Sequence, residues 1–272
     1  MQLTKHIAQG KLLYLSQGEE CLSVSENIHY RWLAFNNDKG EQVIQSVMHK
    51  RKPWKLTLPH QTALLLPLLF FKPQNIVELG LGGGNLDRFL DHLSKNISIK
   101  SIEYSVIVIE NFTRYFNPDK TEIEIIHSNS HDWLTQIDKA PLDWLICDVY
   151  QHKEQDANQT IKQLESLLEN VDSNACLSIN LPDATDNEVN LCLTVLQQLA
   201  NDHQILYFHI PNYLNIVIHL IPKHWQTFKL LKRNKHCYLP YNIVLQWRKF
   251  WLQGNEVDHQ INFKKPLTFY RE

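Results

Sequence analysis

The chain has 272 residues, of which 43% are hydrophobic and 21% charged, and its formal net charge is −2. This composition allows a full hydrophobic core, and it excludes a disordered chain and a strongly basic nucleic-acid coat protein. The longest apolar run, residues 63–71, has nine residues. A membrane-spanning helix needs about twenty, so we expect no integral membrane protein.

The N-terminus and the cysteines indicate a cytoplasmic protein. The first ten residues contain no long apolar core, so no secretion signal is expected. The five cysteines form an odd set without a Cys-x-x-Cys pair. This pattern argues against a disulfide framework and a cysteine zinc site, and a reducing cytoplasm is the simplest interpretation.

Residues 1–54 are predicted to form a small N-terminal β-hairpin region. Short strands are expected at residues 11–15, 22–25, 30–35 and 42–48. The polar turn at 36–40 lies between the last two strands and ends in glycine, which predicts that they form a hairpin.

Residues 55–222 alternate between helix and strand and are predicted to form the nucleoside-binding catalytic domain. Helices are expected at residues 56–71, 85–95, 105–116, 155–169 and 187–200. Strands are expected at 75–79, 97–102, 123–126, 142–147, 176–180, 205–209 and 215–220. This alternation predicts an α/β, Rossmann-like fold with a mostly parallel seven-stranded sheet between helices. The last two strands are too close for a helical crossover, so that pair is expected to be antiparallel.

Residues 223–272 are predicted to be a C-terminal helical extension with a helix at 242–253. Residues 203–255 hold seven basic residues, ten aromatic residues and no acid, with a basic cluster at 229–235 and interleaved charge and rings at 247–251. Such a composition can stack bases and neutralise phosphates. It equally suits a helix whose aromatic side chains cover the sheet edge or contact a partner, so nucleic acid is the less favoured interpretation.

Half of the chain's eight glycines fall within five positions: Gly80, Gly82, Gly83 and Gly84. They follow a predicted strand and precede a predicted helix, where bare backbone lets a ligand approach closely. The spacing is not Gly-x-Gly-x-x-Gly, and no Lys-Ser/Thr pair follows, which excludes a P-loop. An acid, Glu78, stands two residues before the first glycine.

Polar residues also follow the neighbouring strands at their carboxyl ends. Glu103 ends the next strand, where a carboxylate can accept both ribose hydroxyls of a nucleoside. Residues 127–133 follow the third strand, where a side chain can read an adenine edge, and Asp148 follows the fourth. The combination predicts a nucleoside site at this edge of the sheet.

Residues 78–84, Glu-Leu-Gly-Leu-Gly-Gly-Gly, resemble the first motif of class I S-adenosylmethionine-dependent transferases. More specifically, residues 20–220 resemble the spermidine synthases, which are polyamine aminopropyltransferases, and their bacterial look-alikes. The residues that carry this resemblance lie at 45–48, 58–60, 76–84, 102–103, 128–134 and 143–148.

The resemblance implies a class I methyltransferase fold and a reaction. Spermidine synthases bind decarboxylated S-adenosylmethionine at the glycine turn, an amine attacks the carbon beside the sulfonium, and methylthioadenosine leaves. The N-terminal hairpins usually help to form a homodimer. Carried over, the donor-binding set is Gln45, His60, Glu78, Gly80, Gly82, Gly84, Asn85, Glu103 at the ribose, and Asn129 and Ser130 at the adenine. Asp148 faces the incoming amine as the catalytic residue, because a carboxylate there can orient or accept its proton.

Four acids of the family are amides in this chain: Asn85, Gln61, Asn129 and Gln151. An amide at Asn129 can still pair with adenine. The other three changes weaken the case for a polyamine acceptor, because buried ammonium groups need carboxylates. Glu154, Asp156 and Asp183 follow the fourth and fifth strands and are candidate substitutes.

Three functions therefore stay open. Aminopropyl transfer is the first. Methyl transfer from S-adenosylmethionine is the second, because an acid such as Glu78 is typical of methyltransferases, where it helps to hold the methionine amine. A non-catalytic relative that keeps the nucleoside pocket is the third. No metal is expected, because His127, His131 and His152 straddle a strand end rather than share a helix face.

Overall fold

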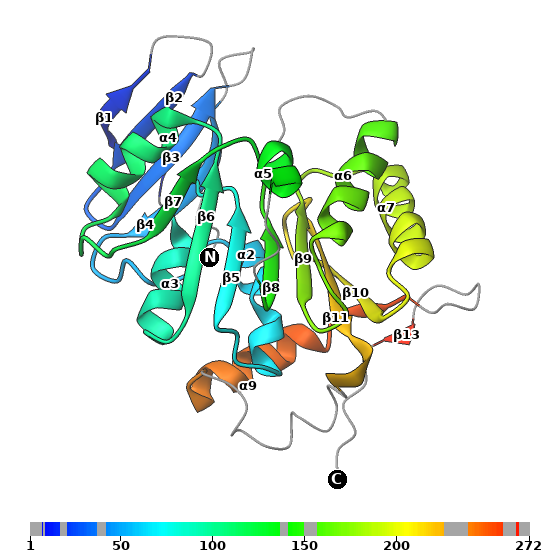
Figure 1. Cartoon of the computed structure of the whole chain (residues 1–272). Coiled ribbons are helices and arrows are strands. Elements are labelled where there is room, and N and C mark those ends of the chain that lie inside the picture. The colour runs from blue at the N-terminus through cyan, green and yellow to red at the C-terminus, as the bar shows by residue number, and fades with distance from the viewer. Residues whose placement is uncertain are drawn as a thin grey trace.

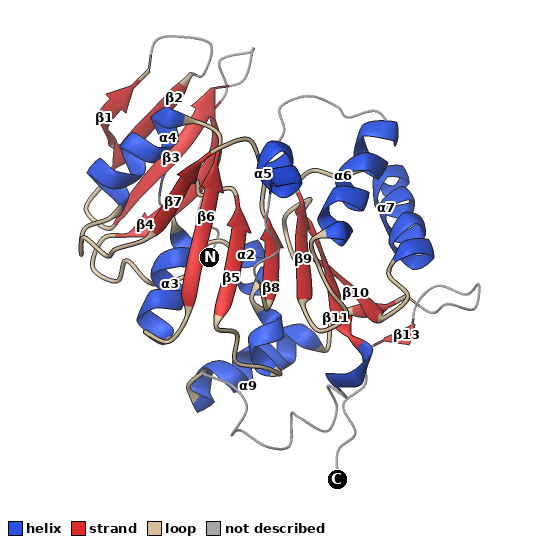
Figure 2. Ribbon diagram, viewed as in Figure 1, coloured by secondary structure: helices blue, strands red, loops and turns tan. Residues whose placement is uncertain are grey.

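The computed structural model describes residues 7, 9–16, 21–36, 42–136, 141–149, 157–225, 239–257 and 265–266. A four-stranded antiparallel sheet lies beside a nine-stranded sheet that carries helices on both faces (Figure 1). Figure 2 shows the same layers by secondary structure, with the small sheet next to α4 and the large sheet between two groups of helices.

The small sheet has the order β1-β2-β3-β4 and matches the predicted hairpin region. Its strands are β1 (Lys11–Leu15), β2 (Leu22–Glu26), β3 (Tyr30–Asn36) and β4 (Gln42–His49). One face packs Leu22 and Leu33 against Phe112 and Phe116. The other face is covered in part by Leu58. Burial on both faces fixes this sheet beside the glycine turn.

The large sheet contains all seven predicted strands, in the order β10-β11-β9-β8-β5-β6-β7. They are β5 (Asn75–Leu79), β6 (Ser98–Glu103), β7 (Glu124–His127), β8 (Trp144–Cys147), β9 (Cys176–Leu181), β10 (His203–His209) and β11 (Ile216–Pro222). The strands from β5 to β9 pair in parallel, and β10 pairs antiparallel with β11 as predicted. The carboxyl ends of β5, β6, β7 and β8 therefore meet at one edge.

The prediction of seven strands was too low by two. The strands β12 (Asn255–Glu256) and β13 (Lys265–Pro266) extend the sheet beyond β10. Asn255 pairs with Tyr207 and Glu256 with Leu206. Each added strand has two residues, too few to show a period in the sequence, so only tertiary pairing reveals them.

Helices cover the two faces of the sheet in separate hydrophobic clusters. On one face lie α2 (Pro59–Leu64), η1 (Leu66–Leu69), α3 (Asn85–Leu93) and α9 (Tyr241–Trp251). On the other lie α5 (Ser130–Gln136), α6 (Ala157–Glu169) and α7 (Asp186–Leu199). The helix α4 (Val106–Asn111) and its continuation η2 (Phe112–Phe116) pack between the two sheets. The short turn η3 (Lys223–Trp225) follows β11. None of the helices in the described part of the chain is long and apolar enough to span a membrane.

The predicted helix at 56–71 is broken in the structure. It begins at Pro59, where a missing N–H costs nothing, and Gln61 caps its first turn. It stops at Leu64 and resumes as the 3-10 turn η1, which contains Pro67. A proline inside an α-helix removes a hydrogen bond and clashes with the preceding turn, which explains the break.

A buried chain of hydrogen bonds holds α2 on the sheet. The indole of Trp144 donates to Ser178 Oγ over 2.9 Å, and that hydroxyl lies 2.7 Å from Nδ1 of His219. The other ring nitrogen of His219 lies 3.0 Å from the carbonyl oxygen of Ala63 in α2. Burial lowers the pKa of His219 to about 3, so the ring is neutral. Its Nε2–H donates a hydrogen bond to the carbonyl oxygen of Ala63.

The two tryptophans of α9 pack into the core. Trp247 stacks with Phe89, and Trp251 lies edge-on to Phe70. Both tryptophans are buried, so they are not available to stack on nucleic-acid bases. The basic stretch at 229–235 lies outside the described residues.

Candidate functional site

The glycine turn joins β5 to α3 and brings bare backbone against two neighbouring elements. Gly80 has φ +94°, and a Cβ there would lie 2.6 Å from the carbonyl oxygen of Asp148. Gly84 has φ +62°, and a Cβ there would lie 2.3 Å from the ring of Phe112. Side chains at these two positions are excluded by conformation and by contact. The glycines thus allow the turn after β5 to approach the end of β8 and the ring of Phe112 in η2.

Glu103 lies at the end of β6 and is hydrogen-bonded to the glycine turn. Its Oε2 accepts from the amides of Leu81, at 3.1 Å, and Gly82, at 3.4 Å, and its Oε1 accepts from Ser105 N at 2.9 Å. A carboxylate has about four lone-pair sites, and these three bonds leave one of them on Oε1, so the group can still accept a hydroxyl donor. Glu103 is partly exposed and faces a cavity.

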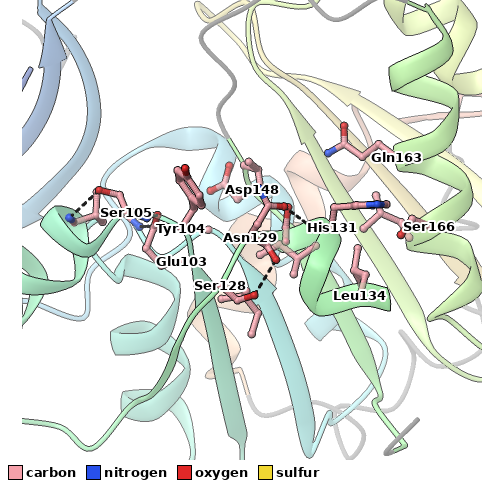
Figure 3. A pocket seen from close by; sticks show the side chains of 18 of the residues that line it. Glu103, Tyr104, Ser105, Ser128, Asn129, His131, Leu134, Asp148, Gln163 and Ser166 are labelled. Atoms are coloured by element: carbon pink, nitrogen blue, oxygen red, sulfur yellow. Dashed lines mark hydrogen bonds between the residues drawn. The ribbon is translucent and has the colours of Figure 1, made fainter. Parts of the chain in front are cut away.

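This cavity, the first compartment, has a volume of about 680 Å³ and lies over the ends of β5, β6 and β7. Figure 3 shows Glu103 and Tyr104 on one side, Gln163 and Ser166 of α6 on the other, and Asn129 and His131 between them. Its apolar lining includes Leu79, Ile102, Val108, Leu134 and Leu167.

Asn129 has a fixed orientation at the start of α5. Its side-chain oxygen accepts from the amide of His131 at 2.9 Å. The amide nitrogen of Asn129 is therefore the group that can face a ligand, and it can only donate. Ser130 is the first residue of α5 and lines the same compartment.

A second compartment of about 250 Å³ continues from the first, because Gln45, Gly80, Gly82 and Asp148 line both. Its other polar lining residues are Ser46, His60, Gln61, Glu78, Asn85, Asn180, Asp183, Tyr213 and Asn215. Within the described ranges, its lining includes three acids and no lysine or arginine. The second compartment is therefore suited to a cation and not to an anion.

Asp148 lies between the two compartments and is oriented by amides. Its Oδ1 accepts from Asn180 Nδ2 over 2.7 Å, and Asn180 Oδ1 accepts from Asn215 Nδ2 over 3.1 Å. Asn180 comes from β9, and Asn215 immediately precedes β11. Two neighbouring strands thus fix the direction of the carboxylate.

The amide of Asn85 is also locked. Its Oδ1 accepts from the guanidinium of Arg88 at 2.7 Å, and Arg88 has no acceptor atom, so this assignment is unambiguous. The nitrogen of Asn85 then donates to Val47 O at 2.8 Å and lies 3.3 Å from Gln61 Oε1. Gln61 Oε1 accepts from Thr57 N, Leu58 N and Asn85, so it offers no acceptor to an ammonium group, whereas Asn85 Oδ1 is directed toward Arg88 and keeps one lone pair.

Two other predicted site residues are titratable: Glu78 is buried, and His60 is half-buried. Burial raises the pKa of Glu78 well above its usual value, and repulsion by Asp87 adds to this. Burial lowers the pKa of His60, with a smaller opposing effect from Asp148. The Nδ1 atom of His60 is buried, and no hydrogen-bond partner for it is found among the described residues. It is therefore a polar atom left over for a ligand.

All predicted site residues except Gly84 line one compartment or the other. Gly84 instead caps the N-terminus of α3. Among the proposed substitute acids, Asp183 lines the second compartment, whereas Glu154 and Asp156 lie outside the described residues, as does Gln151.

Sequence reasoning missed Asn180, Tyr213 and Asn215. Asn180 follows the apolar residues of β9, as Asp148 follows those of β8, so the strand-end rule could have found it. Tyr213 and Asn215 lie in the turn between two antiparallel strands, where no sequence pattern marks a site. Among the residues that the structure describes, no group of three or more metal-ligating side chains comes together.

No family model and no curated protein matches the sequence. Solved structures do match the fold. A spermidine synthase in complex with the transition state analogue AdoDATO has a TM-score of 0.64 at 14% identity, over 88% of this chain and 85% of that chain. This chain has the fold of the spermidine synthases.

Two further solved structures match this fold, a probable spermidine synthase and a methyltransferase. A probable spermidine synthase from Corynebacterium glutamicum matches with a TM-score of 0.62 at 13% identity, over 76% of this chain and 79% of its own. Human Methyltransferase-like protein 13 in complex with SAH has a TM-score of 0.53 at 15% identity, over 71% and 90%. The predicted fold class and the resemblance to spermidine synthases are confirmed at the level of the fold.

Proposed function

We propose that the chain is a transferase that binds an adenosyl sulfonium donor and transfers its aminopropyl group to an amine. The first compartment takes the nucleoside, and the second takes the aminopropyl chain and the acceptor. Asp148 lies where the two meet, so the reacting sulfonium and the attacking nitrogen are placed beside its carboxylate.

The nucleoside is held by groups of the first compartment. Glu103 accepts a ribose hydroxyl at the lone-pair site of Oε1 that the backbone amides leave free. Asn129 donates its amide N–H to a ring nitrogen of adenine, because its oxygen is used by the backbone of His131. Ile102 and Leu134 contact the faces of the base.

The charge of the second compartment is the observation that carries the choice of donor. A decarboxylated donor ends in an ammonium group, whereas S-adenosylmethionine adds a carboxylate to that end. The described lining contains Asp148 and Asp183 but no lysine or arginine. A carboxylate would lose its water there without gaining a cationic partner, which is costly, whereas an ammonium gains two anions.

Asp148 removes the proton that blocks the acceptor amine. The freed lone pair of the nitrogen forms a bond to the aminopropyl carbon that is attached to sulfur. The bond between this carbon and sulfur breaks with its electrons going to sulfur, and methylthioadenosine leaves. Since a sulfonium is already a good leaving group, orientation and charge complementarity supply most of the rate. Asn180 contributes by holding Oδ1 of Asp148, which fixes where the proton is received.

Methyl transfer is the second candidate, because Glu78 lines the compartment where the methionine end of a methyl donor would lie. An assay with both donors and a panel of primary amines separates the two. We expect methylthioadenosine from the decarboxylated donor. Accumulation of S-adenosylhomocysteine from S-adenosylmethionine, with no methylthioadenosine, would reverse the assignment.

The third candidate, a non-catalytic nucleoside-binding relative, makes a different prediction. A nucleoside would raise the melting temperature, but neither product would form with any acceptor. The homodimer and the cytoplasmic location implied earlier stay predictions, and light scattering coupled to size-exclusion chromatography tests the first of them.

A further inference from the structure

Two buried carboxyl groups lie side by side beneath the glycine turn. Glu78 in β5 is 2% exposed, and Asp87 in α3 is fully buried. Ser101 of β6 lies between them, with its Oγ 2.6 Å from Asp87 Oδ1 and 3.4 Å from Glu78 Oε2. Because a hydroxyl has one proton to donate, Ser101 satisfies Asp87 and leaves Glu78 dependent on other groups.

The nearest cation does not neutralise the pair. Arg88 follows Asp87 in the sequence, but its hydrogen bonds go to the carbonyl oxygens of Pro53, Gly83 and Phe116 and to Oδ1 of Asn85. Oδ2 of Asp87 is buried, and no donor for it is found among the described residues. Two adjacent charges without a bonded counter-ion are strongly unfavourable in the interior.

The pair therefore retains a proton. Burial raises the pKa of Glu78 well above its usual value, and the negative charges of Asp87 and Asp148 raise it further. Burial also raises the pKa of Asp87, but the hydrogen bond from Ser101 and the charge of Arg88 act against this. These causes favour the proton on Glu78 over Asp87, with the carboxyl O–H of Glu78 as the hydrogen-bond donor to the Asp87 carboxylate.

Glu78 also lines the second compartment, whereas Asp87 does not. A cation that enters this compartment interacts more favourably with an ionised Glu78 than with a neutral one. We propose that Glu78 and Asp87 hold one proton between them in the free protein and that a cationic group in the second compartment displaces it, so that donor binding releases a proton. The identity of the cation, a decarboxylated sulfonium donor, rests on the proposed function.

This device replaces what Asn85 and Gln61 do not provide. Both are amides without a charge, so the inner wall of the compartment has no permanently ionised acid beside Asp148. Glu78 becomes that acid only when a positive charge is present, which avoids an unpaired buried carboxylate in the free protein. Asp87 touches no ligand and is a positioning residue, since it determines where the proton is held.

Calorimetry with two ligands tests the proposal on the unmodified protein. Methylthioadenosine is the matched control, because it has the same nucleoside as the donor but neither the sulfonium nor the ammonium. Each ligand is titrated at neutral pH in buffers with different ionisation enthalpies, and the slope of the binding enthalpy gives the protons released. We expect about one proton for the decarboxylated donor and none for methylthioadenosine.

The pH dependence gives a second readout. The alkyl ammonium of the donor keeps its proton near neutral pH, as a lysine with a pKa of about 10.4 does, so its own titration does not interfere. The affinity for the donor should rise with pH, by up to about tenfold per unit, wherever Glu78 is protonated in the free protein and ionised in the complex. The affinity for methylthioadenosine should stay constant over the same range.

Variants then assign the proton. Glu78→Gln should abolish the release. Asp87→Asn should shift the pH range of the release downward, because the substitution removes the negative charge of Asp87 but leaves Glu78 buried. Asp91→Asn is the control, because Asp91 lies on the same helix but pairs with Lys95 at the surface. Thermal unfolding verifies that each variant is folded.

The outcomes separate this inference from the proposed function. Equal proton release by the donor and by methylthioadenosine, or an unchanged release in Glu78→Gln, would overturn the shared proton while leaving the nucleoside site in place. If neither ligand binds, the adenosyl donor itself is wrong.

Discussion

The two compartments are built by different means although they share four lining residues. In the first, the backbone makes the site: the glycine turn lies bare, and its amides hold Glu103. In the second, side chains hold one another, as in the bonds from Asn180 to Asp148 and from Arg88 to Asn85. The first compartment therefore tolerates changes around it, whereas the second depends on a connected set of partners.

This difference suggests that the first compartment determines nucleoside affinity and that the second determines the choice of reaction and acceptor. In the proposed function, a nucleoside is recognised by one carboxylate and a bare turn, which many transferases of this fold can provide. The proposed cation is recognised by the arrangement of amides and acids in the second compartment. Substitutions in the first compartment should therefore change the affinity for any adenosyl ligand, and those in the second should change the reaction or the acceptor.

The largest effect is expected for Asp148→Asn. The amide keeps the shape of the side chain but cannot accept the proton of the attacking amine, so turnover should fall by roughly 10²- to 10⁴-fold. Methylthioadenosine should still bind within about a factor of three, because the nucleoside groups are untouched. Initial rates and calorimetry measure the two quantities.

Equal losses of turnover and nucleoside affinity in Asp148→Asn would show that the residue supports the conformation of the glycine turn rather than accepting the proton of the amine. Asp148 does contact the turn through its backbone, which donates from N to Leu79 O over 2.9 Å. The substitution leaves this backbone bond in place, so the two roles can be separated.

The next largest effect is expected for Glu103→Gln. One oxygen is replaced by an NH₂ donor, so the side chain can no longer accept from both the backbone amides and a ribose hydroxyl. Hydrogen bonds to charged groups contribute about 1.5–3 kcal/mol each, and affinity for methylthioadenosine should fall by roughly 10- to 150-fold. Glu110→Gln, on the exposed face of α4, is the matched control. An unchanged affinity in Glu103→Gln would remove the ribose role.

The sequence predicted the first compartment better than the second for a physical reason. Gly80, Glu103 and Asp148 lie at strand ends, and parallel strands must bring those ends together once the alternation of strand and helix is recognised. The orientation of Asn85 depends on Arg88, which itself is held by carbonyls from distant loops. Such orientations follow from tertiary packing, so a motif alone cannot reveal them.

The same reason explains the errors in the fold. The break near Pro67 was visible in the sequence, but the apolar density of the segment outweighed it in the prediction. The strands β12 and β13 carry no pattern of their own and exist because β10 offers a free edge.

A third prediction concerns the family acid that this chain lacks. Asn85→Asp restores it, but it places a carboxylate oxygen against Val47 O and Gln61 Oε1, where Asn85 now donates. Arg88 can bind only one side of the new carboxylate. We expect a loss of about 1–3 kcal/mol in the free energy of unfolding, measured by denaturant titration. A variant that is as stable as the parent and binds the donor more tightly would show that the locked amide is not a structural requirement.

The smallest effect is expected for Asp183→Asn, at the outer end of the second compartment. Asp183 has φ +51°, a left-handed conformation that asparagine also tolerates, so the substitution removes the charge without straining the backbone. Because the side chain is exposed, water screens its attraction for an ammonium group. The KM for a diamine acceptor should rise only a few-fold, and that for a monoamine with no second charge should stay constant. Asp186→Asn, an exposed acid in the first turn of α7 that lines neither compartment, should change neither value. If Asp183→Asn raises both KM values equally, Asp183 acts on the shape of the compartment rather than on the distal charge of the acceptor.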